Sequence, residues 1–254
     1  MSSSISTLIL SPHCDDAPLS LGAALLDGVF GERPRVAVVF SRSRYTKTQP
    51  CTGEEPEVTR LRNAEERAAA DRADYDVEFW GYGEPFVRPG FNPDCTSDSQ
   101  LFDVTRSIEG DVAWRAVSSA VEDALSRHEG LLMVPLGCGN HIDHRIVHHA
   151  VLQCYAKYPR IWVGFYEDLP YCNHICDEDI LSHVPNLNDR KLSSRLVQLG
   201  IDSKISLLRI YRSQFWRFDL DKVHAYWNRR SGERFWVEEA VPLCNDSRQS
   251  LPTG

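Results

Sequence analysis

The 254-residue sequence contains no long hydrophobic run, and no stretch approaches the roughly 18 apolar residues that a membrane-spanning helix requires. The first ten residues carry no basic segment ahead of their apolar run, so they do not resemble a secretory signal peptide. We therefore expect a cytoplasmic protein without a membrane partner. The sequence gives no indication of the oligomeric state.

An excess of positive charge is also absent, since 28 Lys and Arg residues face 36 Asp and Glu residues, for a net charge of -8. Nucleic-acid binding depends on many contacts from Lys and Arg to phosphates, so no nucleic-acid partner is expected. A small neutral or cationic substrate is compatible with this charge.

Cysteines are present, but their spacing does not match a zinc finger. Cys172 and Cys176 form the only close pair, and no second pair follows at a matching distance. Because the chain is large and lacks an export signal, we expect free thiols rather than a disulfide framework.

The hydrophobic pattern predicts strands that alternate with helices along most of the chain. The predicted strands are 7–11, 35–41, 77–82, 131–136 and 161–166, and the predicted helices are 18–30, 57–73, 111–127 and 143–157. Long polar loops are predicted at 42–56 and 83–110. Beyond residue 170 the pattern is weaker, with helices at 202–215 and 219–228 and a strand at 234–237.

This alternation favours an α/β fold, namely a Rossmann-like, mostly parallel sheet with helices on both faces. We expect a single domain over 1–254, with a core at about 6–170 and a C-terminal α+β extension at about 171–254. Ligands of such sheets bind beyond the carboxyl ends of the strands.

Two polar clusters directly follow predicted strands, and both are thus expected at this edge of the sheet. The first contains His13, Asp15 and Asp16, and the second contains His141, Asp143 and His144. Two imidazoles and a carboxylate suit zinc, although iron or another divalent ion is compatible. The alternative from the residues alone is that the aspartates cap the following helices and His141 is an ordinary loop residue.

The segments His13-Cys14-Asp15-Asp16 and His141-Ile142-Asp143-His144 resemble the two signature motifs of the PIG-L/LmbE family of deacetylases. This family removes acetyl groups from N-acetylglucosamine-type sugars and related natural products. Weaker similarities extend the resemblance over about residues 6–216. They are Arg62-x-x-Glu65, the segment Tyr166-Glu167-Asp168-Leu169-Pro170, and Lys204 followed by Tyr211-x-Ser213-Gln214.

The resemblance implies a role for each motif residue. It implies that His13, Asp16 and His144 bind Zn²⁺, with Fe²⁺ or another divalent ion as alternatives. It further implies that Asp15 is the general base and that His141 stabilises the oxyanion or protonates the leaving amine. Asp143 would orient His141, and its charge would keep that imidazole protonated.

Three residues are expected to contact an amino-sugar-type small-molecule substrate. The resemblance implies this for Arg62, and Arg44 follows a predicted strand at the ligand edge. Tyr166 ends a predicted strand and offers a ring for sugar stacking. The chain departs from the family pattern at Cys14, Ala17 and Glu84, which leaves the ligand set intact and bears on the substrate.

Other functions remain open at this point. One is a metal-dependent amidase or esterase with a non-sugar substrate, and another is a non-catalytic metal-binding member of the fold. A nucleotide-binding protein is disfavoured, because the first predicted strand leads into His-Cys-Asp-Asp instead of a Gly-x-Gly-x-x-Gly turn.

Overall fold

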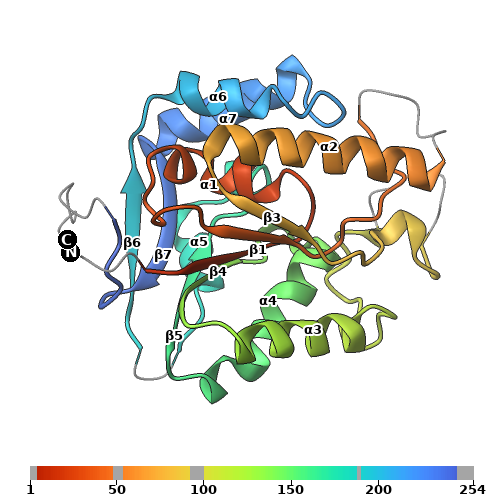
Figure 1. Cartoon of the computed structure of the whole chain (residues 1–254), viewed down its shortest axis with the longest axis horizontal. Coiled ribbons are helices and arrows are strands. Elements are labelled where there is room, and N and C mark those ends of the chain that lie inside the picture. Colours follow the sequence, from red (N-terminus) through yellow and green to blue (C-terminus); the bar gives the residue numbers. More distant parts are fainter. Residues whose placement is uncertain (1–4, 48–53, 92–99, 188–189, 245–254) are drawn as a thin grey trace.

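A computed structural model describes residues 5–47, 54–91, 100–187 and 190–244. Parts of the two long predicted loops, 48–53 and 92–99, lie outside the described residues. The described chain forms one twisted sheet between layers of helices (Figure 1). None of the helices in the described ranges has the length and apolar character needed to cross a bilayer.

The sheet has seven strands, of which the first five are parallel. Their order across the sheet is β3 (Asp76–Phe79), β2 (Arg35–Val38), β1 (Thr7–Ser11), β4 (Gly130–Pro135) and β5 (Ile161–Tyr166). Two antiparallel strands, β7 (Glu233–Glu238) and β6 (Leu192–Val197), then continue it beyond β5.

Strand β1 is the central one of the five parallel strands. Leu8, Ile9 and Leu10 are fully buried, which explains why the strand is a continuous apolar run rather than an alternating one. Ile9 lies between Val36 of β2 and Met133 of β4. Because the chain runs outward from β1 to β3 and then restarts at β4, the strand order reverses between β1 and β4. Ligands of open α/β sheets bind beyond the strand ends at this switch point.

Helices cover both faces of the sheet (Figure 1). Helices α1 (Asp16–Leu26), α2 (Glu55–Ala73) and α6 (Ile201–Leu208) lie on one face, and α3 (Trp114–Ser126) and α4 (Ile142–Cys154) lie on the other. Each face has its own buried apolar cluster. The remaining elements are α5 (Asp177–His183), α7 (Arg217–Arg230) and the short 3₁₀ turns η1 (Pro85–Val87), η3 (Cys138–Asn140), η4 (Tyr155–Lys157) and η5 (Tyr171–His174).

The predicted fold class is confirmed; the predicted strands 35–41 and 77–82 end earlier, at Val38 and Phe79, and the larger differences fall in the C-terminal part. Strand β6 was not predicted, because Leu-Ser-Ser-Arg-Leu-Val is a half-buried edge strand with a weak apolar pattern. The helix predicted at 202–215 ends at Leu208 and is followed by turns. The extension contributes both antiparallel strands to the main sheet.

A buried ion pair ties this extension to the first helix. The Glu233 carboxylate accepts the backbone N–H groups of Ala23 (3.0 Å) and Ala24 (2.9 Å), and it also pairs with Lys204. These N–H groups are available because α1 has a non-helical residue at Leu21. Burial lowers the pKa of Lys204, and Glu233 opposes this effect. Glu233 thus joins α1, α6 and β7.

We predict that Glu233→Ala lowers the free energy of unfolding by about 3–5 kcal/mol, because it leaves a buried ammonium unpaired. The measurement is urea denaturation. The control is Glu239→Ala, which removes a half-exposed carboxylate paired with Lys191 and should change stability by less than about 0.5 kcal/mol. Equal stability of the two variants would contradict the role of Glu233.

Candidate active site

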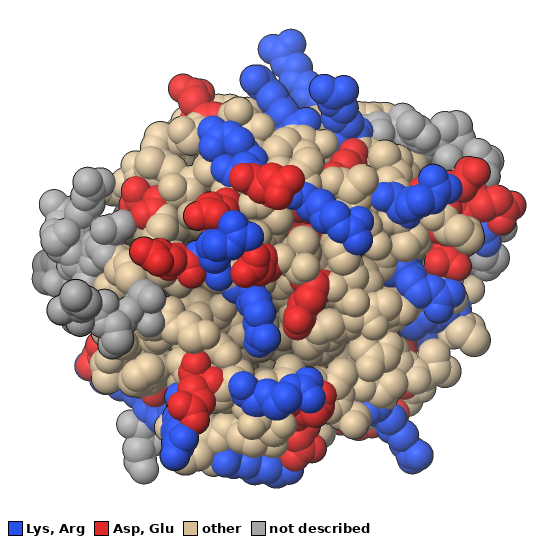
Figure 2. Space-filling model, viewed as in Figure 1, with Lys and Arg blue, Asp and Glu red and all other residues tan. Residues whose placement is uncertain are grey.

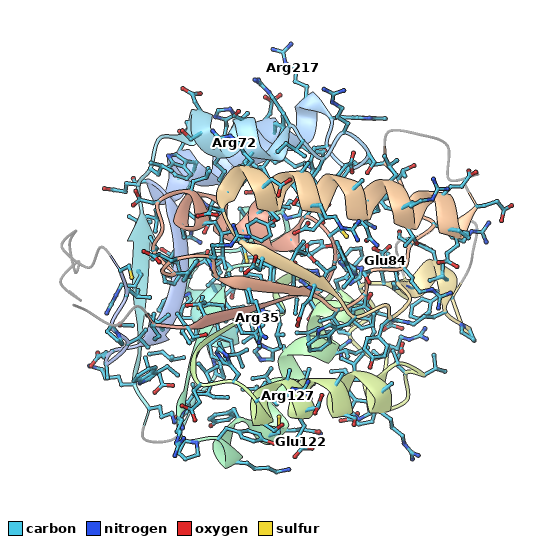
Figure 3. The ribbon with its side chains drawn as sticks, in the orientation of Figure 1. Arg35, Arg72, Glu84, Glu122, Arg127 and Arg217 are labelled. Carbon is cyan, nitrogen blue, oxygen red and sulfur yellow. The ribbon has the colours of Figure 1, made fainter. Side chains whose placement is uncertain are left out.

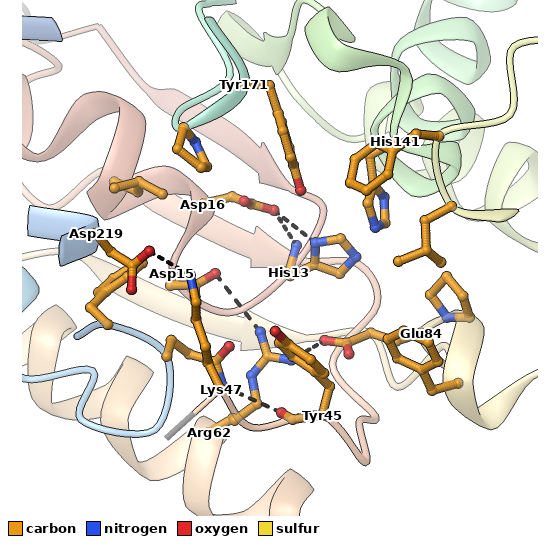
Figure 4. Close-up of a pocket in the computed structure, with 18 of the residues that line it drawn as sticks. His13, Asp15, Asp16, Tyr45, Lys47, Arg62, Glu84, His141, Tyr171 and Asp219 are labelled. Carbon is orange, nitrogen blue, oxygen red and sulfur yellow. Dashed lines mark hydrogen bonds and ion pairs between the residues drawn. The ribbon is translucent and has the colours of Figure 1, made fainter. Parts of the chain in front are cut away.

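The two polar segments meet at the carboxyl edge of β1 and β4, although about 130 residues separate them in sequence. One oxygen of Asp16 lies 3.1 Å from Nδ1 of His13 and 3.2 Å from Nε2 of His144. The donor atoms of these three residues all lie within 4.8 Å of one another. The predicted convergence therefore occurs, and His13 and Asp16 line a pocket (Figure 4).

These three side chains fit a divalent cation. Nε2 of His144 is buried and has no hydrogen-bond partner among the described residues, although it faces a carboxylate oxygen. Two imidazole nitrogens and one carboxylate oxygen match the protein ligands of catalytic zinc sites. A second group, formed by His13, His141 and Asp143, shares His13 and also has donor atoms within 4.8 Å.

Protons compete with a cation for these side chains. Burial alone would lower the pKa of His13, but Asp16 and Asp143 raise it well above its ordinary value. Burial also lowers the pKa of His144, but Asp16 and Asp168 outweigh this effect and raise the pKa to about 9. The Asp16 pKa is lowered by the two imidazoles in spite of burial. Because imidazoles must be neutral to ligate, metal affinity should increase as the pH rises toward about 9.

Asp168 fixes the orientation of His144. Its Oδ1 lies 2.6 Å from Nδ1 of His144, and its Oδ2 accepts the backbone N–H of Cys138 at 3.1 Å. This contact directs Nε2 of His144 toward the site. Cys138, Asp168 and Cys172 also have clustered donor atoms, but the carboxylate there is already engaged by these hydrogen bonds.

Asp15 lies beside the ligands in a strained backbone conformation, with φ at 92°. Its side chain makes no helix-capping hydrogen bond, which excludes the capping alternative for this residue. Burial raises the pKa of Asp15 well above its usual range, and Arg62, 3.8 Å away, opposes this rise. A cation at the neighbouring site would further favour the carboxylate.

Buried Glu66 holds the backbone of Asp15 in place. Its carboxylate accepts the N–H of Asp15 at 2.9 Å, and the hydroxyls of Tyr75 and Tyr211 both donate to it at 2.8 Å. This network connects α2, the residue before β3 and the turn after α6 to the site, so the positive φ is maintained by surrounding structure.

The predicted pairing of Asp143 with His141 is wrong. The Asp143 carboxylate instead lies 2.9 Å from Nε2 of His13 and 2.5 Å from Nη1 of Arg88. Burial alone would raise the pKa of Asp143, but the charge of Arg88 and the contact with His13 lower it to about 2. The pKa of His141 is lowered well below its ordinary value by burial and by the charge on His13. Both effects favour the neutral form of the His141 imidazole.

The neutral His141 ring has a defined tautomer. Its Nδ1 accepts the backbone N–H of Asp143 at 3.3 Å, so the ring proton is on Nε2.

Arg88, which binds Asp143 and Asp111, was missed by the sequence analysis, because it lies in a loop without hydrophobic periodicity.

The three expected substrate contacts have different outcomes. Arg62 lines the pocket, where it pairs with Glu84. Tyr166 does not, since its ring is fully buried and its hydroxyl donates to the Leu10 carbonyl at 2.9 Å. Arg44 is not among the residues that line the pocket. The prediction for Tyr166 is therefore corrected, and the half-buried Arg44 lies off the pocket wall.

The pocket wall contains residues that the sequence analysis did not assign. Its aromatic members are Tyr45, Phe86, Phe102, Tyr171 and Phe215. These aromatic residues come from loops and from the C-terminal part of the chain. They do not directly follow a parallel strand, so the expectation that ligands bind at strand ends did not point to them. Figure 3 shows Glu84, another wall residue, lying inside the fold, whereas Arg217 projects outward.

The chain is similar to known proteins in sequence and in fold. The family model described as PIG-L, GlcNAc-PI de-N-acetylase, matches residues 8–155. A 2'-N-acetylparomamine deacetylase from Streptomyces fradiae is 28% identical over 169 residues, which covers 65% of this chain and 57% of that protein. The chain thus matches little more than half the length of this curated relative.

Two solved structures share the fold. A deacetylase–teicoplanin complex has a TM-score of 0.67 at 20% identity, and the match covers 95% of this chain and 100% of that chain. A zinc-inhibited form of teicoplanin deacetylase has a TM-score of 0.63 at 21% identity, with 95% and 99% covered.

We predict that Asp168→Asn weakens zinc binding by about 10–100-fold, because His144 loses the carboxylate that orients it. The measurement is a competition titration against a chromophoric chelator. The control is Asp123→Asn on the surface of α3, where the carboxylate is half-exposed and pairs with Arg127. If both variants bind zinc like the unchanged protein, Asp168 does not position the ligand.

Proposed function

The chain belongs to the PIG-L family, and from this premise we propose that it removes an N-acetyl group from an amino sugar or a sugar-bearing small molecule. The observation that carries the proposal is the convergence of His13, Asp16 and His144 at the edge of the sheet where Asp15 lines a pocket. A binding-only member of the fold would not need a carboxylate next to the ligands.

We propose zinc as the physiological ion, since two imidazoles and one carboxylate are its usual catalytic ligands. Iron(II) or another divalent ion would suit the same donors and is distinguished by metal analysis. When bound, such an ion lowers the pKa of a water ligand and polarises the amide carbonyl.

Asp15 then acts as the general base. Its carboxylate lines the pocket beside Asp16, and its position is held by Glu66 through the backbone and by the nearby Arg62. It accepts the proton that water loses on attack at the carbonyl carbon. The same proton then passes from Asp15 to the departing nitrogen, so the products are a free amine and acetic acid, which releases its proton to become acetate.

His141 stabilises the negative oxygen that develops on the carbonyl. Because its Nδ1 accepts a backbone N–H, the neutral ring donates through Nε2. This assignment needs no protonated imidazole, which agrees with the low pKa of His141. Asp143 keeps His13 oriented rather than taking part in the proton transfer.

The pocket and the relatives support a sugar-bearing substrate. The wall combines aromatic rings with the carboxylates of Glu84 and Asp219 and the ammonium of Lys47, which suits a polar ring system with amino groups. The relatives named above act on an acetylated paromamine or bind teicoplanin. Figure 2 shows acidic and basic side chains interspersed over the visible face, and we propose neither a nucleic-acid nor a membrane partner.

We predict acetate release from N-acetylated amino sugars or sugar-bearing natural products, with loss of release under a chelator and recovery on adding zinc.

Asp15→Asn should retain its metal and lose about 10²–10⁴ in kcat, because it removes the base. The measurements are an enzymatic acetate assay and elemental analysis, with Asp123→Asn as the active control. Full activity of Asp15→Asn would refute the base assignment. Equal turnover of simple acetamides or acetate esters would favour the non-sugar hydrolase.

A further inference from the structure

Tyr171 lies against the site and is not part of the roles assigned above. It is the first residue of η5, directly after the loop that follows β5, and it lines the pocket. Its ring is nearly parallel to that of His141 (6.1 Å between centroids, 23°). It stands edge-on to His144 at 5.4 Å and to Phe102 at 5.5 Å. The ring is therefore fixed from three directions.

Gly139 makes this position possible. A Cβ at residue 139 would lie 2.4 Å from Cβ and 2.7 Å from Cγ of Tyr171, and Gly139 has a φ of +76°. Any other residue there would displace Tyr171 from its place beside His141. The turn that carries His141 is thus shaped around the tyrosine.

The hydroxyl of Tyr171 points into the reacting space. In Figure 4 its side chain extends from the ribbon toward Asp16 and His13, with the hydroxyl at the near end. This hydroxyl has no hydrogen-bond partner among the described residues. The phenol is therefore a donor that nothing in the described protein uses.

We propose that the Tyr171 hydroxyl donates a hydrogen bond to the acetyl oxygen of the substrate, which becomes an oxyanion when water adds to the carbonyl carbon. This inference rests on the proposed function. An oxyanion can accept more than one hydrogen bond, and His141 provides only one, through Nε2. Because the two rings are nearly parallel and their centroids lie 6.1 Å apart, their donors can reach one oxygen from neighbouring directions. Tyr171 is thus a second oxyanion donor contributed by the segment after β5.

A different role for Tyr171 would be a wall against which a sugar ring stacks. Stacking acts on the bound substrate as well as on the transition state, so its loss raises KM. A bond made only to the developing oxyanion lowers kcat and leaves KM nearly unchanged. Tyr171→Phe separates the two roles, because it keeps the ring and removes only the hydroxyl.

The first test is steady-state kinetics of zinc-loaded Tyr171→Phe. We expect kcat to fall by about 10²-fold with KM changed by less than about threefold. Elemental analysis should show an unchanged metal content. The control is Tyr166→Phe, which deletes a hydroxyl bound to the Leu10 carbonyl outside the pocket and should keep its kcat. An unchanged kcat for Tyr171→Phe, or a raised KM alone, overturns the proposal.

The second test does not depend on finding the substrate. Methylphosphonate resembles the tetrahedral form of an acetyl group, and calorimetry measures its affinity for the zinc-loaded protein. Tyr171→Phe should weaken this binding by about tenfold, and Tyr166→Phe should leave it unchanged. Equal affinities in the unchanged protein and Tyr171→Phe overturn the proposal. If the unchanged protein releases no acetate from any N-acetyl compound, the proposed function fails, and this binding comparison still decides the role of Tyr171.

Discussion

The rest of the site depends on a single buried carboxylate oxygen of Asp16 that faces two imidazoles, those of His13 and His144. It can do so because β1 and β4 are neighbours in the sheet and the turns after them meet at the switch point. The donor atoms of these three residues are buried and lie within 4.8 Å of one another. Their geometry is best explained by a divalent cation.

Concentrating acidic groups at this edge requires compensation, because an unpaired buried charge costs several kcal/mol. Two buried arginines provide it on either side of the site. Arg62 pairs with Glu84 and lies near Asp15, and Arg88 pairs with Asp143. The arrangement separates the carboxylates by role. In the function that we propose, a carboxylate near an arginine either orients another side chain, as Asp143 does, or accepts a proton, as Asp15 does, and the Asp16 carboxylate between the imidazoles binds the metal.

The sequence predicted the sheet and the convergence well, because buried strands and the residues that follow them are local signals. It could not predict which side chains pair across the site, since this depends on ring and carboxylate orientation. Asp143 was therefore assigned to His141 when it binds His13. Tyr166 ends a strand, but its ring turns into the core. Tyr171 enters the pocket from an irregular segment, where neither periodicity nor a strand end marks a site.

The coordination of the bound ion tests this account most directly, through a crystal structure of the zinc-loaded protein supported by X-ray absorption at the zinc edge. The account predicts one ion with imidazole nitrogens of His13 and His144 at about 2.0–2.1 Å and an oxygen of Asp16 at about 2.0–2.2 Å, with a solvent position left open. An ion held instead by His13, His141 and Asp143, or no ion at this edge of the sheet, would contradict it.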